Sequence, residues 1–219
     1  MGTGQAGNRV ALVTGSAGLV GGAILARLQA EGFAVGGLDE KTGPADLAIS
    51  VDLTNRAETA AAAERVAKEL GPISVLVTAP ELYDAAPFGE MSPDRWRRLL
   101  SAHLGATTNA CAATVPAMVR AGRGTVVTIS SWLALAGIAG ESYYAAATGS
   151  ILAFTKSFAL EVAPKGVRVN CIAVGPLHET TKTAVHVTPD EVAETVMFLV
   201  NDGDFFVGQV LSPAAGAVV

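Results

Sequence analysis

Tyr144 and Ser131 each carry a hydroxyl that can donate a proton or a hydrogen bond. A free tyrosine has a pKa of about 10, so it is a poor base near neutrality unless a neighbouring cation favours its phenolate. Thr148, four positions after Tyr144, is short and uncharged and cannot supply that cation. Lys156 lies about two helical turns further on, ~12 Å by helix rise, and cannot replace it. We therefore expect the pair to lack an activating charge.

The elements that would position these residues follow an alternating pattern. Short β-branched apolar runs alternate with longer alanine-rich stretches of helical period, which is typical of a parallel sheet with helices on both faces. Strands are predicted at residues 10–14, 33–38, 48–52, 73–78, 125–130 and 167–173 and near 210, and helices at 18–31, 55–70, 93–121, 144–162 and 189–201. The prediction is a single doubly wound, Rossmann-like α/β domain over residues 1–219.

Two helix starts carry local signals. Ser92-Pro93 and Thr188-Pro189 each place a hydroxyl at the N-cap and a proline at the first helical position, and Glu191 completes a capping box with Thr188. Helices are therefore expected to begin at both prolines.

A glycine-rich turn follows the first predicted strand and opens a helix. Its glycines are Gly15, Gly18 and Gly21. Glycines at such a turn let the chain bend tightly and let a pyrophosphate approach the N–H groups of the helix N-terminus. They also serve strand-to-helix packing alone, and this second interpretation stays open.

Carboxylates stand where a dinucleotide would place its adenosine. Asp39 and Glu40 end the second strand, where a carboxylate accepts hydrogen bonds from ribose hydroxyls and repels a 2′-phosphate. NAD is therefore favoured over NADP if a dinucleotide binds.

The composition narrows the range of partners. Half of the 219 residues are hydrophobic, 16% are charged, and the mean hydropathy is +0.42, so we expect surface to be buried between subunits. The net charge of -5 comes without a Lys/Arg cluster, which argues against nucleic acid and membrane as partners. Cys111 and Cys171 lie in apolar segments without metal-ligand spacing and predict a reducing cytoplasmic location.

The segment from Ser142 to Ser150 resembles the Tyr-x-x-x-Lys segment of the short-chain dehydrogenase/reductase family, and Thr148 replaces the lysine. Ser131 precedes Tyr144 by the family's usual spacing, so the resemblance makes Tyr144 the general acid or base and Ser131 its hydrogen-bonding helper. In that family the lysine lowers the tyrosine pKa and holds the nicotinamide ribose. Asp52-Leu53 resembles the family's adenine-contacting Asp-Val pair.

Further departures fall at positions that would face the cofactor or the substrate. Pro80-Glu81 replaces a small Ala-Gly pair, and His103 replaces an asparagine that helps to hold a proton-relay water. Glu179 replaces a threonine, and the loop at about 176–188 is much shorter than the family's substrate lid. We therefore expect NAD binding to be weak or absent.

These departures from the family's residues leave the surfaces that are expected to contact other subunits intact. The sequence therefore predicts a pseudoenzyme. Its partner would be an active, homologous NAD-dependent dehydrogenase, possibly one acting on hydroxyacyl thioesters, in a homo- or hetero-oligomer. Three alternatives stay open. They are an active NAD(P)-dependent oxidoreductase using Ser131 and Tyr144, a dinucleotide-sensing regulator, and a catalyst without redox chemistry similar to halohydrin dehalogenases.

Overall fold

A parallel β-sheet is the centre of the computed structural model, which describes residues 9–177, 186–214 and 216. Its seven strands lie in the order β3-β2-β1-β4-β5-β6-β7. They are β1 (Val10–Thr14), β2 (Ala34–Asp39), β3 (Leu47–Ser50), β4 (Ile73–Thr78), β5 (Gly124–Ser131), β6 (Val167–Val174) and β7 (Val210–Leu211). Every residue of β1 is buried, as a central strand covered on both faces requires.

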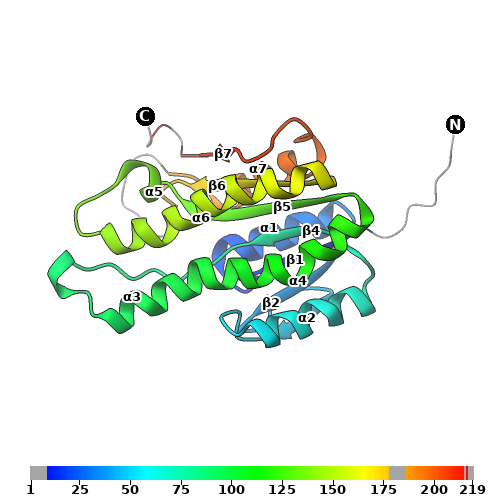
Figure 1. Cartoon of the computed structure of the whole chain (residues 1–219), viewed down its shortest axis with the longest axis horizontal. Helices are drawn as coiled ribbons and strands as arrows, with labels where there is room; N and C mark the ends of the chain where they lie inside the picture. The colour runs from blue at the N-terminus through cyan, green and yellow to red at the C-terminus, as the bar shows by residue number, and fades with distance from the viewer. Residues whose placement is uncertain (1–8, 178–185, 215, 217–219) are drawn as a thin grey trace, which may run out of the picture.

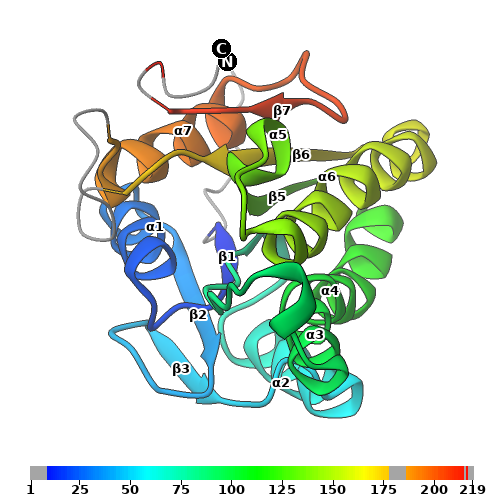
Figure 2. The ribbon, with the colours of Figure 1, turned by 90° about the vertical axis from the view of Figure 1, so that its left-hand side faces the viewer.

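Helices cover both faces of the sheet (Figures 1 and 2). One face carries α1 (Leu19–Ala30) and α7 (Pro189–Asn201), and the other carries α2 (Arg56–Glu69), α4 (Ala106–Ala121) and α6 (Ser142–Val162). Each face has its own apolar core, because alternate strand residues point to opposite sides. The predicted doubly wound α/β fold is confirmed.

The predicted helix caps are present. Ser92 Oγ accepts a hydrogen bond from Arg95 N at the start of α3 (Pro93–Leu100). Thr188 and Glu191 form the reciprocal capping box of α7. Both helices have proline in the first turn, as the sequence indicated.

The helix predicted at 93–121 is not one continuous α-helix. A π-helical segment, η2 (Ser101–Gly105), lies between α3 and α4, and His103 is inside it. A π-helical turn is wider than an α-helical turn. The residues before and after it therefore face directions that differ from those in an unbroken α-helix. The predicted helical span 93–121 is confirmed, but the sequence did not indicate the π turn at the position that places His103.

Other boundaries also differ from the prediction. The strand expected at 48–52 is Leu47–Ser50, because Val51 and Asp52 already turn toward α2. Three short helices were not predicted, and they are η1 (Phe88–Glu90), α5 (Leu133–Ala136) and η3 (Ala163–Lys165). Residues 178–185, with Glu179 and most of the expected short loop, lie outside the described residues.

The strand order reverses direction between β1 and β4, since the chain builds outward from β1 to β3 and then returns to add β4 to β7. Open parallel sheets bind their ligands at such a switch point, outside the carboxyl ends of the strands. Among the described helices, none has the length and apolar character needed to cross a bilayer.

Candidate functional site

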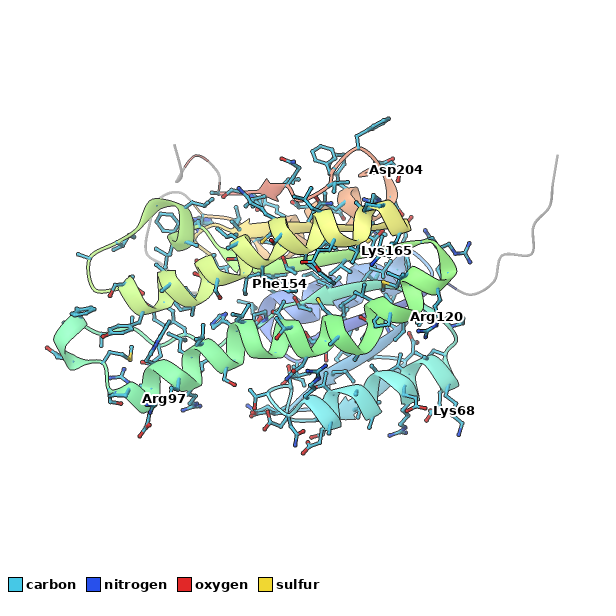
Figure 3. All side chains as sticks on the ribbon, in the orientation of Figure 1. Lys68, Arg97, Arg120, Phe154, Lys165 and Asp204 are labelled. Carbon is cyan, nitrogen blue, oxygen red and sulfur yellow. The ribbon has the colours of Figure 1, made fainter. Side chains whose placement is uncertain are left out.

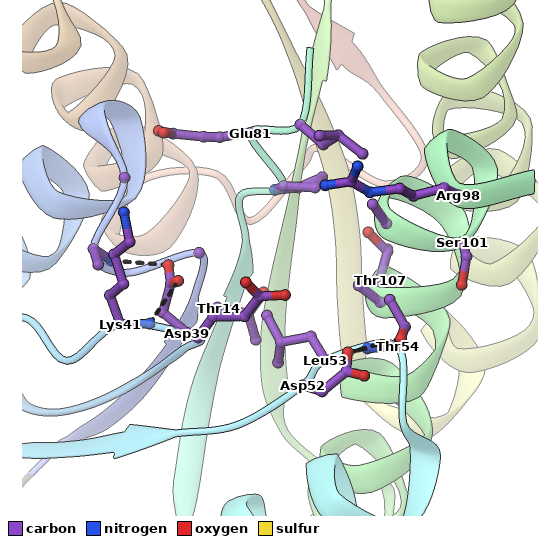
Figure 4. A pocket seen from close by; sticks show the side chains of 18 residues that line it. Thr14, Asp39, Lys41, Asp52, Leu53, Thr54, Glu81, Arg98, Ser101 and Thr107 are labelled. Atoms are coloured by element: carbon purple, nitrogen blue, oxygen red, sulfur yellow. Dashed lines mark hydrogen bonds between the residues drawn. The ribbon is translucent and has the colours of Figure 1, made fainter. Parts of the chain in front are cut away.

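A cavity of about 580 Å³ lies at this switch point (Figure 4). Its lining comes from the ends of β1, β2 and β4, the segment after β3, and the α3–α4 region. Asp39, Asp52, Glu81, Arg98 and Thr107 are among the polar lining residues. This volume is typical of small-molecule sites.

Two of the three turn glycines are required by the protein's own backbone. Gly15 has φ +69°, and a Cβ there would lie 1.9 Å from Ala79 O. A Cβ on Gly21 would lie 2.0 Å from Gly15 O, so the helix could not approach the turn. These contacts support the packing interpretation for Gly15 and Gly21.

The third glycine, Gly18, faces the carboxylate of Glu81. Glu81 Oε1 accepts a hydrogen bond from Val20 N in the first turn of α1 at 2.7 Å. A Cβ on Gly18 would lie 2.1 Å from Glu81 Oε2. Figure 4 shows the Glu81 side chain extending toward the α1 end of the cavity. An internal carboxylate therefore caps the helix N-terminus, where free N–H groups and the helix dipole favour an anion.

The carboxylates after β2 and β3 bind local backbone groups. Asp39 accepts hydrogen bonds from Ala17 N at 3.1 Å and from Lys41 N at 3.3 Å. Asp52 Oδ1 accepts from Thr54 Oγ1 at 2.7 Å and from Thr54 N at 2.8 Å, and these bonds lower the pKa of Asp52. Both predicted carboxylates thus line the cavity in fixed orientations.

Ser131 and Tyr144 come together as the sequence analysis expected, because β5 ends at Ser131 and α6 brings Tyr144 back over that end. Their hydroxyls form a hydrogen bond, which lowers the pKa of Tyr144. Burial has the larger and opposite effect, and the carboxylates of Glu141 and Glu81 raise the pKa further. The net shift is upward, so Tyr144 holds its proton at neutral pH.

Thr148 points its hydroxyl at its own helix. Its Oγ1 donates to Tyr144 O at 2.8 Å, and the residue is buried. Lys156 is exposed further along α6. No cation is among the groups that shift the pKa of Tyr144 in the described part of the chain.

His103 is a buried neighbour of Tyr144. The two ring centroids lie 5.5 Å apart, and His103 Nε2 lies 2.7 Å from Leu82 O. Because a carbonyl oxygen only accepts, Nε2 carries the proton, and in the part of the chain that the structure describes the buried Nδ1 has no hydrogen-bond partner. Burial lowers the pKa of His103. This histidine is held neutral, with one unused acceptor.

The segment after β4, residues 79–90, covers Tyr144, which the sequence analysis did not predict. The Tyr83 ring packs edge-on against Tyr144 with centroids 5.0 Å apart, and its hydroxyl donates to Glu141 Oε1. This bond, with burial, raises the pKa of Tyr83 to about 12. Asp84 pairs with Arg95 of α3. Ser131 and Tyr144 do not line the large cavity.

The segment 79–90 makes a second contact with α6 near its end. The Phe88 and Tyr143 rings stack with centroids 5.4 Å apart, and Tyr143 Oη donates to Phe88 O at 3.1 Å. The aromatic residues Tyr83 and Phe88 were the available sequence signal, but their partners lie more than fifty residues away.

A dinucleotide in this cavity would meet the Glu81 carboxylate. Its pyrophosphate would have to approach the first turn of α1 past Gly18, where the Glu81 carboxylate lies. Two like charges at one helix end repel each other, and Val20 N is already engaged. Asp39 and Asp52, which the sequence predicted to contact adenosine, both line the cavity.

Comparison with known proteins agrees with the fold. Residues 9–191 match the family model described as short chain dehydrogenase. An acetoacetyl-CoA reductase of Shinella zoogloeoides is 33% identical over 95% of this chain and 98% of its own length. A cis-4-hydroxycyclohexanecarboxylate dehydrogenase of Sinomonas cyclohexanicum is 32% identical over 95% and 96%. A 3-oxoacyl-acyl-carrier-protein reductase FabG of Chlamydia trachomatis is 30% identical over 82% and 79%. With its parallel sheet, its glycine turn and its Ser131–Tyr144 pair, this chain belongs to the short-chain dehydrogenase family.

Proposed function

We propose that this chain is a non-catalytic subunit that pairs with an active homologous short-chain dehydrogenase. The observation that carries the proposal is the environment of Tyr144. Burial and two carboxylates raise its pKa, and Thr148 turns its hydroxyl back to the helix at the position where the family has a lysine. A tyrosine that keeps its proton and has no neighbouring cation is a poor base at neutral pH.

The segment over Tyr144 supports the same proposal. A substrate carbonyl must reach both the tyrosine and the serine hydroxyl, and general acid catalysis needs a heavy-atom distance of about 3 Å. Tyr83 packs against the Tyr144 ring and is tied to Glu141. Reaching Tyr144 would therefore require these contacts to break.

The proposed partner follows from what the chain retains. Figure 3 labels Phe154 on the side of the molecule formed by α4 and α6, and its ring stacks on that of Phe158 with centroids 5.1 Å apart. Leu160 is largely exposed on α6. Apolar side chains on an outer helix face favour association with another subunit. Relatives named as acetoacetyl-CoA and 3-oxoacyl reductases make an active dehydrogenase of hydroxyacyl thioesters the partner that we propose.

Turnover assays test the first half of this proposal. The purified chain is mixed with NADH or NADPH and acetoacetyl-CoA, and nicotinamide absorbance is followed. The expected rate equals that of the solution without protein. Thr148→Lys alone should stay at that background, because Glu81 and Tyr83 remain in place. Rapid oxidation of either cofactor by the unaltered chain would sink the pseudoenzyme proposal.

Purification at native expression levels tests the second half. We expect a homologous chain with intact Ser, Tyr and Lys to co-purify in a fixed ratio, and its activity or stability to fall when this chain is removed. A homogeneous assembly of this chain alone would contradict the partner proposal.

A second candidate is an active oxidoreductase, favoured by the preserved Ser131–Tyr144 hydrogen bond. It predicts that Tyr144→Phe abolishes a measurable hydride transfer. The pseudoenzyme proposal predicts no transfer to abolish, so the same assay separates the two candidates.

We also propose that residues 1–219 form one domain in the cytoplasm. One sheet runs through the described residues, and Cys111 and Cys171 are buried free thiols. A single cooperative unfolding transition is expected for one domain.

A further inference from the structure

We infer that the cavity at the switch point accepts a phosphate-free ligand of nucleoside size, neutral or positively charged, and that Glu81 is the residue that excludes phosphates. This inference does not depend on the pairing with a partner. It concerns what the cavity binds, whether or not the chain catalyses a reaction.

Glu81 acts as an internal anion at the end of the cavity. Its carboxylate takes the N–H of Val20 at 2.7 Å and lies against Gly18, which has no side chain to displace it. Glu81 is itself exposed, and a phosphate attracted by the same helix end would have to displace its carboxylate from Val20 N. Phosphorylated ligands therefore bind less tightly than their dephosphorylated forms.

The net charge of the cavity lining also disfavours the binding of a phosphate. Four carboxylates line the cavity, from Asp39, Glu40, Asp52 and Glu81, against two cations, Lys41 and Arg98. A phosphate adds up to two negative charges to a lining that is already net negative. A neutral or cationic molecule meets no such repulsion.

A buried hydroxyl points to an occupant. Thr107 lines the cavity and is fully buried, yet its Oγ1 has no hydrogen-bond partner among the described residues. Buried polar groups are rarely left unpaired, because each costs free energy. A ligand hydroxyl or amine near α4 would satisfy it. Figure 4 shows Thr107 on the side of the cavity opposite Glu81.

The remaining lining suits a flat ring with polar edges. Leu53 supplies apolar surface, and the carboxylates of Asp39 and Asp52 offer acceptors for ligand hydroxyl or amine groups. The volume of about 580 Å³ accommodates a nucleoside. Adenosine is therefore a suitable probe, with AMP and NAD as its phosphorylated counterparts.

Isothermal titration of the full chain with adenosine, AMP and NAD tests the inference. For the unaltered chain we expect adenosine to bind at least tenfold tighter than AMP or NAD. Glu81→Ala should tighten AMP and NAD at least tenfold and change adenosine less than threefold. Glu81→Gln keeps the shape of the side chain and removes its charge, so it should give part of this gain in affinity for AMP and NAD. Glu40→Gln removes one charge from the same lining without removing the hydrogen bond to Val20 N, and should change AMP binding less than threefold.

Three outcomes would overturn the inference. They are no detectable adenosine binding, equal affinities of the unaltered chain for adenosine and AMP, and equal gains from Glu81→Ala and Glu40→Gln. Thr107→Val should weaken adenosine at least threefold without changing the circular dichroism spectrum, and unchanged affinity would also count against the site. Turnover with NADH would refute the pseudoenzyme proposal, whereas these affinities test the cavity alone.

Discussion

Replacing Gly18 with alanine would report directly on the contact between Glu81 and α1. The added methyl carbon would lie 2.1 Å from Glu81 Oε2, far inside van der Waals contact. Gly18 itself has φ -77° and ψ 174°, which alanine adopts without strain. The substitution therefore forces the carboxylate of Glu81 away and leaves Val20 N to water.

The expected cost follows from the hydrogen bond that is lost. Hydrogen bonds to charged groups contribute about 1.5–3 kcal/mol, and solvent at this partly exposed site reduces the value to ~1 kcal/mol. Alanine is also a poorer N-cap than glycine by about 0.5 kcal/mol. Gly18→Ala should therefore lower the free energy of unfolding by ~1.5 kcal/mol, which lowers the Tm by roughly 3–6 °C in a chain of this length.

A double-mutant cycle separates the two contributions. Glu81→Ala alone should cost ~1 kcal/mol, and adding Gly18→Ala to it should cost only the N-cap difference of about 0.5 kcal/mol. The four chains are unfolded in urea at one protein concentration, because association makes stability concentration-dependent. Additive costs, within about 0.3 kcal/mol, would refute the contact.

Three further predictions concern titratable groups whose pKa the fold shifts. Burial lowers the pKa of His103 below its ordinary 6.5, so the unfolded chain takes up the proton first as the pH falls. The contribution of neutral His103 to the free energy of unfolding is therefore fully present above about pH 6.5 and is lost as the pH falls below it. In thermal melts across this pH range, the Tm of His103→Asn should not show this decline. Tyr83 should ionise near pH 12, and Glu141→Gln should move this ionisation down toward 10 in an ultraviolet titration of tyrosinate, whereas an unchanged titration would contradict the hydrogen bond. Burial raises the pKa of Cys111 and Cys171 to about 12, so both thiols should resist labelling at neutral pH until the chain is denatured, and rapid native labelling would contradict their burial.

The elements that depend on local sequence were predicted well. The β1 and β4 boundaries agree with the structure, because continuous apolar runs bounded by turn residues mark buried strands. The caps at Ser92 and Thr188 were also found, since the hydroxyl and its N–H partner lie three residues apart. Such features are encoded within a few neighbouring positions.

The features that the sequence could not give depend on distant segments. A charge at Glu81 was expected near the cofactor position, but its hydrogen bond to Val20 requires the end of β4 to lie beside α1. The cover of Tyr83 over Tyr144 joins segments on either side of β5 and has no local signal. The π segment around His103 also escaped prediction, because helical periodicity alone does not reveal one widened turn.

Glu81 connects the two altered parts of the site. At the α1 end its carboxylate occupies the anion position, and the same negative charge raises the pKa of Tyr144. A lysine at position 148 would supply a cation but leave this carboxylate in place. Removing Glu81 would free the helix end but leave Tyr144 partly buried, beside Glu141 and, among the described residues, without a neighbouring cation. No single substitution reverses both changes, so the proposal of a non-catalytic subunit predicts no turnover from either Glu81→Ala or Thr148→Lys alone.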